Sequence, residues 1–298
     1  MSWSEDSLHR WLLPRLATRP LAGSPGHDAA VLRTLGGRPV VCVDQTIEGV
    51  HAELGVRPGE LGRKAAARAL SDLAATAATP RAVTLALAAP DTRSERWLRS
   101  LIEGVERAAE EVGADLVGGD LARVEGPVTL SVTALGELAG RRTPPGRDRA
   151  RPGQVVALTG AVGGSRAGRH LRIVPRIAEG RALWRAGATA LMDVSDGLAW
   201  DLHRLARASG VRIELEAVPV HRDARRAARQ SGRTALDHAL HDGEDHELIA
   251  CLPSGARLPA GARVIGRVRR GSGVWLLPPL AETARAWEPG EGGWRHGA

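Results

Sequence analysis

The chain has 298 residues and a mass of 31.5 kDa, which is long enough for two domains that each bury their own core. Hydrophobic residues make up 43% and charged residues 25% of the chain, a balance typical of a soluble globular protein. The net charge of +7 argues weakly for a nucleic-acid-binding protein, because the 41 basic residues are spread along the chain and no Phe or Tyr is present to stack on bases.

The N-terminal segment and the apolar runs predict a cytoplasmic protein without a membrane partner. Glu5 and Asp6 stand where a signal peptide would carry basic residues, and no apolar run reaches the roughly 18 residues that a membrane span needs. Cys42 and Cys251 lie in apolar runs, which predicts reduced, buried thiols. The diffuse positive charge would attract anionic substrates rather than a nucleic acid.

Helices and strands alternate through the first 140 residues, which predicts an α/β domain. We expect helices at 4–17, 58–78 and 94–112. We expect strands at 39–44, 83–87, 116–118 and 128–135. Pro58 is well suited to a first helical position.

Several acids stand at the ends of these predicted elements. Asp28 follows a Gly-Ser-Pro-Gly turn, Asp44 ends a strand, and Asp120 closes a predicted Gly-Gly-Asp turn. Asp72 lies four residues after Arg68 on one face of a helix, a spacing that is also typical of a surface ion-pair ladder. Acids at strand ends are common in the ligand sites of α/β proteins, although each one alone is more often a cap or turn residue.

The stretch at 141–147, rich in Arg and Pro, predicts a boundary between a domain at 1–140 and a domain at 141–298. In the second domain we expect strands at 155–159, 211–215, 246–252, 263–268 and 274–277. The glycine-rich turn at 160–168 is similar to a phosphate-binding P-loop, but Arg169 and His170 stand where that motif requires Lys and Ser or Thr. We therefore interpret this turn as packing between a strand and a helix.

Residues 191–210 combine a short apolar run, a turn with two acids, and a helix. Asp193, Ser195 and Asp196 lie within four residues, and a helical pattern runs from Leu198 to the stop at Ser209 and Gly210. Crowded carboxylates are costly unless a positive group is near, and Mg²⁺ prefers such oxygen ligands. An Asx-turn with a helix cap explains the same residues equally well, so this stretch alone leaves both interpretations open.

A series of motifs resembles the thiamine-monophosphate kinase family, a member of the aminoimidazole ribonucleotide synthetase-like superfamily. In chain order the motifs are GHDAAVL (26–32), VDQTIEGVH (43–51), GRKAAARALSDLAA (62–75), VGGDL (117–121), RDRARPGQVVALTGAVGGSRAG (147–168), MDVSDGL (192–198) and DGEDHEL (242–248). The resemblance runs nearly end to end. It implies an N-terminal α/β domain with a mixed sheet, which binds ATP and magnesium and dimerises, and a C-terminal α/β domain that completes the nucleotide and substrate sites.

The resemblance also implies a reaction, the transfer of the ATP γ-phosphoryl group to thiamine phosphate to form thiamine diphosphate. The acceptor is a phosphate monoester with a second pKa of about 6, so it is mostly dianionic at neutral pH and needs no general base. Two anionic groups that must approach in line need charge neutralisation and positioning. We therefore expect several Mg²⁺ ions and no catalytic side chain. The family also suggests a homodimer whose first-domain sheets meet.

The resemblance assigns roles to individual residues. Magnesium ligands would be Asp28, Asp44, Asp72, Asp120 and Asp193, with Asp196 as a further ligand or nearby acid. ATP would contact Gly119, Asp120, Arg147 and Ser195. Thiamine phosphate would contact His51, Glu244 and Trp294, and an indole suits its cationic thiazolium ring. Without the resemblance these three would be interpreted as a loop histidine, a turn acid and a capping tryptophan.

The chain departs from the family's pattern at several positions. The family usually has an acid at His27, hydroxyl residues at Cys42 and Val43, asparagine at Ala69 and an aromatic residue at Ala52. A backbone carbonyl can replace a lost hydroxyl ligand of a metal. The departures nevertheless leave open a catalytically weakened ATP-binding paralogue with a regulatory or scaffolding role. An ATP-dependent enzyme similar to aminoimidazole ribonucleotide synthetase is a further alternative.

Overall fold

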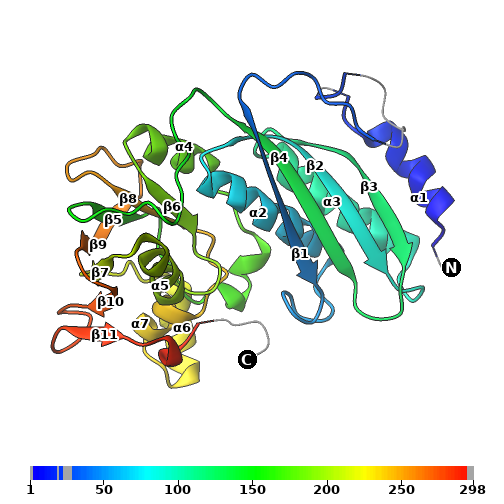
Figure 1. Cartoon of the computed structure of the whole chain (residues 1–298). Coiled ribbons are helices and arrows are strands. Elements are labelled where there is room, and N and C mark those ends of the chain that lie inside the picture. Colours follow the sequence, from blue (N-terminus) through cyan, green and yellow to red (C-terminus); the bar gives the residue numbers. More distant parts are fainter. Residues whose placement is uncertain (1–2, 19, 23–28, 294–298) are drawn as a thin grey trace. The chain divides into compact units, whose positions relative to one another are not determined.

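The computed structural model describes residues 3–18, 20–22 and 29–293, and the chain divides into two compact units (Figure 1). Unit 1 comprises Met1–Leu73, Ala78–Arg141 and Leu171–Pro175, and unit 2 comprises Ala74–Ala77, Arg142–His170 and Arg176–Ala298. The predicted boundary at 141 lies at the end of the main part of unit 1. Each unit contains a sheet with parallel and antiparallel strands covered by helices, so the predicted mixed α/β fold is confirmed.

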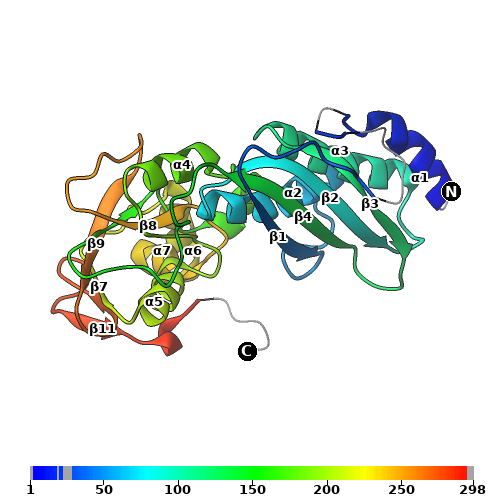
Figure 2. The same ribbon diagram turned by 45° about the horizontal axis from the view of Figure 1, so that its top comes forward.

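Unit 1 is built on a four-stranded sheet with strand order β1-β4-β2-β3. The strands are β1 (Arg38–Ile47), β2 (Thr79–Ala89), β3 (Asp115–Arg123) and β4 (Thr129–Leu138). Only β2 and β3 run parallel. Helices α2 (Pro58–Ala75) and α3 (Glu95–Glu110) cover one face of the sheet (Figure 2). Alternate residues of β2 and β4 are buried, which is the pattern of a sheet covered on one face.

Helix α1 (Glu5–Leu12) is shorter than the predicted helix at 4–17. The Ser4 hydroxyl caps its N-terminus by accepting the Ser7 amide at 3.2 Å. Pro14 has no N–H to donate to the preceding turn, so the chain continues as a 3₁₀ turn over Leu13–Arg15. Leu8 is fully buried and anchors the helix on its apolar side.

The prediction of a turn at Gly119 and Asp120 is wrong, because both residues lie within β3. The parallel pairing with β2 continues past them to Arg123. A Cβ atom on Gly119 would lie 1.9 Å from the carbonyl oxygen of Leu85 on β2. Glycine is therefore required here by the close approach of two strands, which a sequence cannot distinguish from a glycine that forms a turn.

Unit 2 is built on a seven-stranded sheet with strand order β11-β10-β7-β9-β5-β8-β6. The strands are β5 (Val155–Leu158), β6 (Ala190–Asp193), β7 (Arg212–Leu215), β8 (Leu248–Leu252), β9 (Arg263–Arg269), β10 (Gly273–Leu276) and β11 (Arg285–Trp287). The helices are α4 (Ile177–Arg185), α5 (Leu198–Ser209), α6 (Arg222–Ser231) and α7 (Ala235–His241). The predicted helix after the acidic turn is confirmed as α5, whose Leu198, Leu202 and Leu205 are fully buried in the core.

Several elements of unit 2 were not predicted, and the two cysteines differ in burial. The sequence did not indicate α4, α6, α7 or β11. Cys251 is buried and Cys42 is only half-buried, and both are free thiols. Among the described residues, no helix combines the length and the apolar character needed to cross a membrane.

The glycine contact between β2 and β3 can be tested with a neighbouring control. We expect Gly119→Ala to lower the free energy of unfolding by about 1–3 kcal/mol, because the added methyl group collides with strand backbone. Gly118→Ala should change it by less than about 1 kcal/mol, since no atom lies within 4 Å of its added Cβ. Urea unfolding of both variants, without ligand, measures the difference, and equal effects would contradict the role given to Gly119.

Candidate functional site

In unit 1, Asp44 lies on β1 and faces helix α2, where Arg68 binds it at two points. Arg68 Nε donates to Oδ2 of Asp44 at 2.9 Å, and Nη2 donates to Oδ1 at 3.2 Å. The side chains of Arg68 and Asp44 are 12% and 25% exposed, so solvent screens this pair only partly. A predicted magnesium ligand is therefore held by a cationic side chain of its own chain.

His51 follows β1, and hydrogen bonds fix its backbone and its ring. The fully buried Lys64 of α2 donates from Nζ to the carbonyl oxygen of His51. The amide of Ile47 donates to Nδ1 of His51 at 3.0 Å. In the neutral imidazole the proton must then sit on Nε2, which makes that nitrogen a hydrogen-bond donor. A donor at this position can bind a phosphate oxygen but cannot accept a proton.

Asp120 lies on the sheet face that α2 and α3 leave open. It lines a cavity of about 640 Å³ together with Thr84, Ser131 and Thr133 from neighbouring strands. Gly118 and Gly119 also line this cavity, as do residues of α1 and the following turn, including His9, Arg10, Leu12, Leu13 and Leu16. The size of the cavity and its mixed apolar and polar lining are those of a small-molecule site.

The sheet separates Asp44 from Asp120. Across the strands Asp44 pairs with Val132, Val132 with Leu85, and Leu85 with Gly119. Three strand spacings of about 4.8 Å place the two acids about 14 Å apart, on opposite faces. One ion cannot bind both, so any magnesium ions at these acids must be different ones. Asp72, another predicted magnesium ligand of unit 1, lies half-buried on α2.

In unit 2, the turn at 194–197 is organised by Asp201, a residue that the sequence analysis missed. Asp201 Oδ2 accepts the amides of Ser195 and Asp196 at 2.9 and 3.0 Å. Burial, together with the nearby Asp196 carboxylate, raises the pKa of Asp201 to about 8, although the hydrogen bond from the Asp196 amide opposes this rise. The N-cap of α5 is Gly197, and no side chain caps it, so Asp193 and Asp196 do not serve as helix caps.

Asp196 and Asp193 both have cationic partners. Arg204 Nη1 forms an ion pair with Asp196 and lies 3.2 Å from Oδ1 of Asp201. His246 Nδ1 lies 2.9 Å from Oδ2 of Asp193. Burial lowers the pKa of His246, but Asp193 and Glu244 outweigh it and raise the pKa to about 9. The imidazole is therefore positively charged at neutral pH and balances the Asp193 carboxylate.

Glu244 and His246 lie in a loop with an uncommon backbone. Their φ angles are 56° and 51°, in the left-handed region that side chains other than glycine rarely adopt. The Glu244 amide donates to Ser195 O and the His246 amide donates to Val194 O, both at 2.8 Å. These bonds bring together Asp193, Ser195 and Glu244, three of the predicted site residues. They also explain why β8 begins at Leu248 rather than at the predicted His246.

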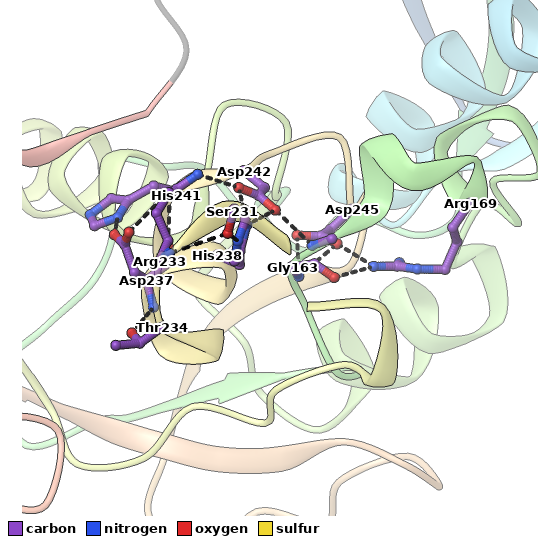
Figure 3. A network of polar contacts seen from close by, with 11 residues as sticks. Gly163, Arg169, Ser231, Arg233, Thr234, Asp237, His238, His241, Asp242 and Asp245 are labelled. Atoms are coloured by element: carbon purple, nitrogen blue, oxygen red, sulfur yellow. Dashed lines mark hydrogen bonds and ion pairs between the residues drawn. The ribbon is translucent and has the colours of Figure 1, made fainter. Parts of the chain in front are cut away.

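The glycine-rich turn at 160–168 uses its amides within the protein, as shown in part in Figure 3. The Gly163 amide donates to both carboxylate oxygens of Asp245, at 3.0 and 2.9 Å, and the Gly164 amide donates to Asp242 at 2.9 Å. Arg169, which stands where a P-loop has lysine, binds Asp245 at 2.6 Å (Figure 3). The amides of Gly163 and Gly164 thus have partners within the chain, and the two glycines lie against Ala239 of α7 and Ala224 of α6, in agreement with the predicted packing role.

The remaining predicted site residues lie apart from these groups or outside the described residues. Arg147 is an exposed residue whose carbonyl oxygen accepts the Ser209 hydroxyl at 3.0 Å. Asp28 and Trp294, together with His27, lie outside the residues that the structure describes. Within the described part of the chain, no group of three or more His, Cys, Asp or Glu residues is arranged to hold a metal ion.

The pKa of the Asp245 carboxyl allows a pH-dependent test of the loop at 243–247, which contacts the glycine-rich turn. Burial raises that pKa to about 6, although Arg169 and the Gly163 amide oppose the shift. Between the unfolded and folded pKa values the folded state holds more protons, so this group's contribution to the free energy of unfolding falls as pH rises from about 4 to 6. The substitution Asp245→Asn keeps a side-chain oxygen that can accept the Gly163 amide, and it removes the titratable carboxyl group.

We therefore expect wild type, relative to Asp245→Asn, to lose up to about 3 kcal/mol between pH 4 and pH 7. Denaturant unfolding at several pH values measures this difference. Asp237→Asn is the control, because Arg233 and His241 outweigh burial and lower the pKa of Asp237. Its carboxyl is then ionised in both the folded and the unfolded state above about pH 5, so its own titration should contribute little to the pH dependence between pH 5 and 7. A difference between wild type and Asp245→Asn that is independent of pH would contradict the raised pKa.

Comparison with known proteins places these features in a family. Residues 26–138 match the family model of "AIR synthase related protein, N-terminal domain". The chain is 36% identical to the thiamine-monophosphate kinase of Rhodopirellula baltica, over 96% of both chains. It is 39% identical to that of Mycobacterium tuberculosis, over 83% of this chain and 79% of the relative.

Solved structures agree with the sequence comparison. AaThiL complexed with AMPPCP and TMP superimposes with a TM-score of 0.79 at 28% identity, over 98% of this chain and 95% of that chain. The hydrogenase maturation protein HypE in complex with ATP has a TM-score of 0.77 at 22% identity, over 94% and 93%, which shows a shared fold. From the identity and coverage of its relatives, the chain belongs to the thiamine-monophosphate kinase family.

Proposed function

We propose that the protein transfers the γ-phosphoryl group of ATP to thiamine phosphate and forms thiamine diphosphate. The main support for this proposal is the 36% identity to a thiamine-monophosphate kinase over 96% of both chains. The similarity to a kinase structure that contains AMPPCP, an ATP analogue, and TMP supports the same pair of substrates. We further propose that the enzyme acts in the cytoplasm.

The chemistry of the acids fits magnesium. The proposed ligands are Asp28, Asp44, Asp72, Asp120, Asp193 and Asp196. Their carboxylate oxygens are the ligand type that Mg²⁺ prefers, and Asp120 is exposed to solvent within a cavity wall. When bound, Mg²⁺ neutralises phosphate oxygens and so lets two anions approach each other.

The chain's own residues would bind and orient the two substrates. We propose that ATP contacts Gly119, Asp120, Arg147 and Ser195, and that the cavity beside Gly119 and Asp120 receives part of the nucleotide. His51 Nε2–H would donate to the acceptor phosphate. Glu244 would balance the thiazolium charge, and Trp294 would stack on the thiamine rings. None of these residues needs to remove a proton, because the acceptor is already an anion.

A homodimer is part of the proposal. Val41 and Val43 of β1 are 68% and 64% exposed and lie on the open face of the unit 1 sheet. Exposed apolar side chains on a sheet face favour contact with a partner. A second copy of this face is the partner that the family resemblance implies.

The alternative is a paralogue that binds ATP without turnover. The Cys42 thiol donates to the carbonyl oxygen of Ala69 at 3.1 Å, so two departures from the family's pattern contact each other beside Asp44. This arrangement favours a changed metal site. An assay of the purified protein with ATP, Mg²⁺ and thiamine phosphate, with thiamine diphosphate as the measured product, separates the two functions.

Removal of single acids tests their proposed roles. We expect Asp72→Asn and Asp120→Asn each to lower kcat about 100-fold or more, the scale of losing one electrostatic contact to a transition state. The melting temperature without ligand should stay equal or rise, because asparagine has nearly the same shape as aspartate and the substitution removes the cost of holding a charged carboxylate in the folded chain. Asp91→Asn is the control, since Asp91 forms a surface pair with Arg123 and should leave kcat unchanged. Normal kcat with a lower melting temperature would show that the acids are structural.

The pH profile tests the absence of a general base. Activity should fall as pH drops through about 6, where the acceptor phosphate gains a proton. His51→Gln should raise the KM for thiamine phosphate without moving this midpoint, because the imidazole donates a hydrogen bond and accepts no proton from the substrate. Steady-state rates between pH 5 and 8 measure both quantities. Disappearance of the midpoint in the variant would instead identify His51 as a base.

A further inference from the structure

We propose that Arg68 competes with Mg²⁺ for Asp44, so that a metal ion binds Asp44 only after the guanidinium has moved away. The inference deepens the proposed function, because it concerns how one of the proposed magnesium ligands becomes available. It rests on the geometry of Asp44 and on the chemistry of the residues around it, all within unit 1.

Arg68 uses a two-point contact that occupies both oxygens of Asp44. Nε donates to Oδ2 and Nη2 donates to Oδ1, the planar pairing that makes arginine–carboxylate contacts strong. An ion that approaches this carboxylate would share its oxygens with a positive group in direct contact with them. Two cations on one partly buried carboxylate repel each other, because the low local dielectric screens them weakly.

A second side chain near Asp44, the thiol of Cys42, is also a poor partner for Mg²⁺. Cys42 lies two residues before Asp44, on the same face of β1, and its thiol bonds to the carbonyl of Ala69, the residue next to Arg68. A thiol is a soft ligand and a poor partner for Mg²⁺, unlike the carboxylate beside it. Arg68 and Cys42 therefore place a cation and a thiol, neither of which is a ligand that Mg²⁺ prefers, on the side of Asp44 that faces α2.

Helix α2 offers a matched comparison. Arg63 also makes a two-point ion pair, with both contacts to Glu111 at 2.6 Å, and Glu111 is not a proposed ligand. Arg63→Met and Arg68→Met remove the same charge and the same type of contact from one helix. The two variants therefore separate competition at Asp44 from a general change in the protein's electrostatic field.

The experiment measures Mg²⁺ binding to nucleotide-free protein by isothermal titration calorimetry at constant ionic strength. Arg68→Met should lower the dissociation constant for Mg²⁺ about three- to tenfold, the scale of losing one partly exposed ion pair. Arg63→Met should match wild type. In an Asp44→Asn background, Arg68→Met should bring no gain, because the carboxylate for which both cations compete is absent.

A second variant guards against loss of folding. Arg68→Lys keeps the positive charge but lacks the planar two-point contact, so its Mg²⁺ affinity should lie between those of wild type and Arg68→Met. Equal Mg²⁺ affinity of the Arg63 and Arg68 variants would overturn the proposal, as would no binding in any variant. Weaker binding in Arg68→Met would also overturn it, because Arg68 would then help to build the metal site.

The same preparations distinguish this inference from the proposed function. The kinase assay of wild-type protein tests the phosphoryl transfer alone, since it does not depend on the comparison between arginine variants. Tighter Mg²⁺ binding by Arg68→Met without any wild-type kinase activity would support the competition and contradict the proposed function. Wild-type kinase activity together with an unchanged Mg²⁺ affinity in Arg68→Met would support the proposed function and contradict the competition between Arg68 and Mg²⁺.

Discussion

Three backbone hydrogen bonds between the turn at 194–196 and the loop at 243–247 determine the site in unit 2. Val194 N–Glu247 O, His246 N–Val194 O and Glu244 N–Ser195 O are each 2.8 Å long and continue the pairing of β6 with β8. The loop accommodates them through a left-handed backbone at Glu244 and His246. As a result Asp245 and Glu247 are buried, and buried carboxylates need partners. Gly163 and Arg169 bind the first, and Thr159 and Arg176 bind the second.

The balance of charge is the second constraint on the structure. Three of the acids with a proposed metal role already contact a cation of the same chain: Asp44 contacts Arg68, Asp193 contacts His246, and Asp196 contacts Arg204. These pairs compensate the charge of partly buried carboxylates, which would otherwise be costly to remove from water. If these acids bind metal as proposed, the same pairs would add a free-energy cost to that binding. An arginine-rich chain with a single lysine thus uses rigid guanidinium contacts where a metal ion could also act.

The structure also limits the chemistry that the site can perform. The His51 ring accepts an amide at Nδ1, and the His246 ring is charged and held between two carboxylates, so neither imidazole is placed as a free base. Phosphoryl transfer to a phosphate acceptor requires none, because positioning and charge neutralisation supply the catalysis. Asp201 contributes by fixing the amides of Ser195 and Asp196, and thereby the orientation of the turn that follows Asp193.

The sequence by itself determined the fold class, the family, the helix that follows Asp196 and the packing role of the glycine-rich turn, because periodic apolar residues and motif order depend on local spacing. The family resemblance also assigned metal and substrate roles to several acids and to His51, and these assignments remain predictions. Only the tertiary structure decided that Gly119 serves a contact between strands, that Asp44 and Asp120 lie on opposite faces of one sheet, and that Arg68 binds Asp44. Strand register and ion pairing join residues that are far apart in the chain, so no local pattern encodes them.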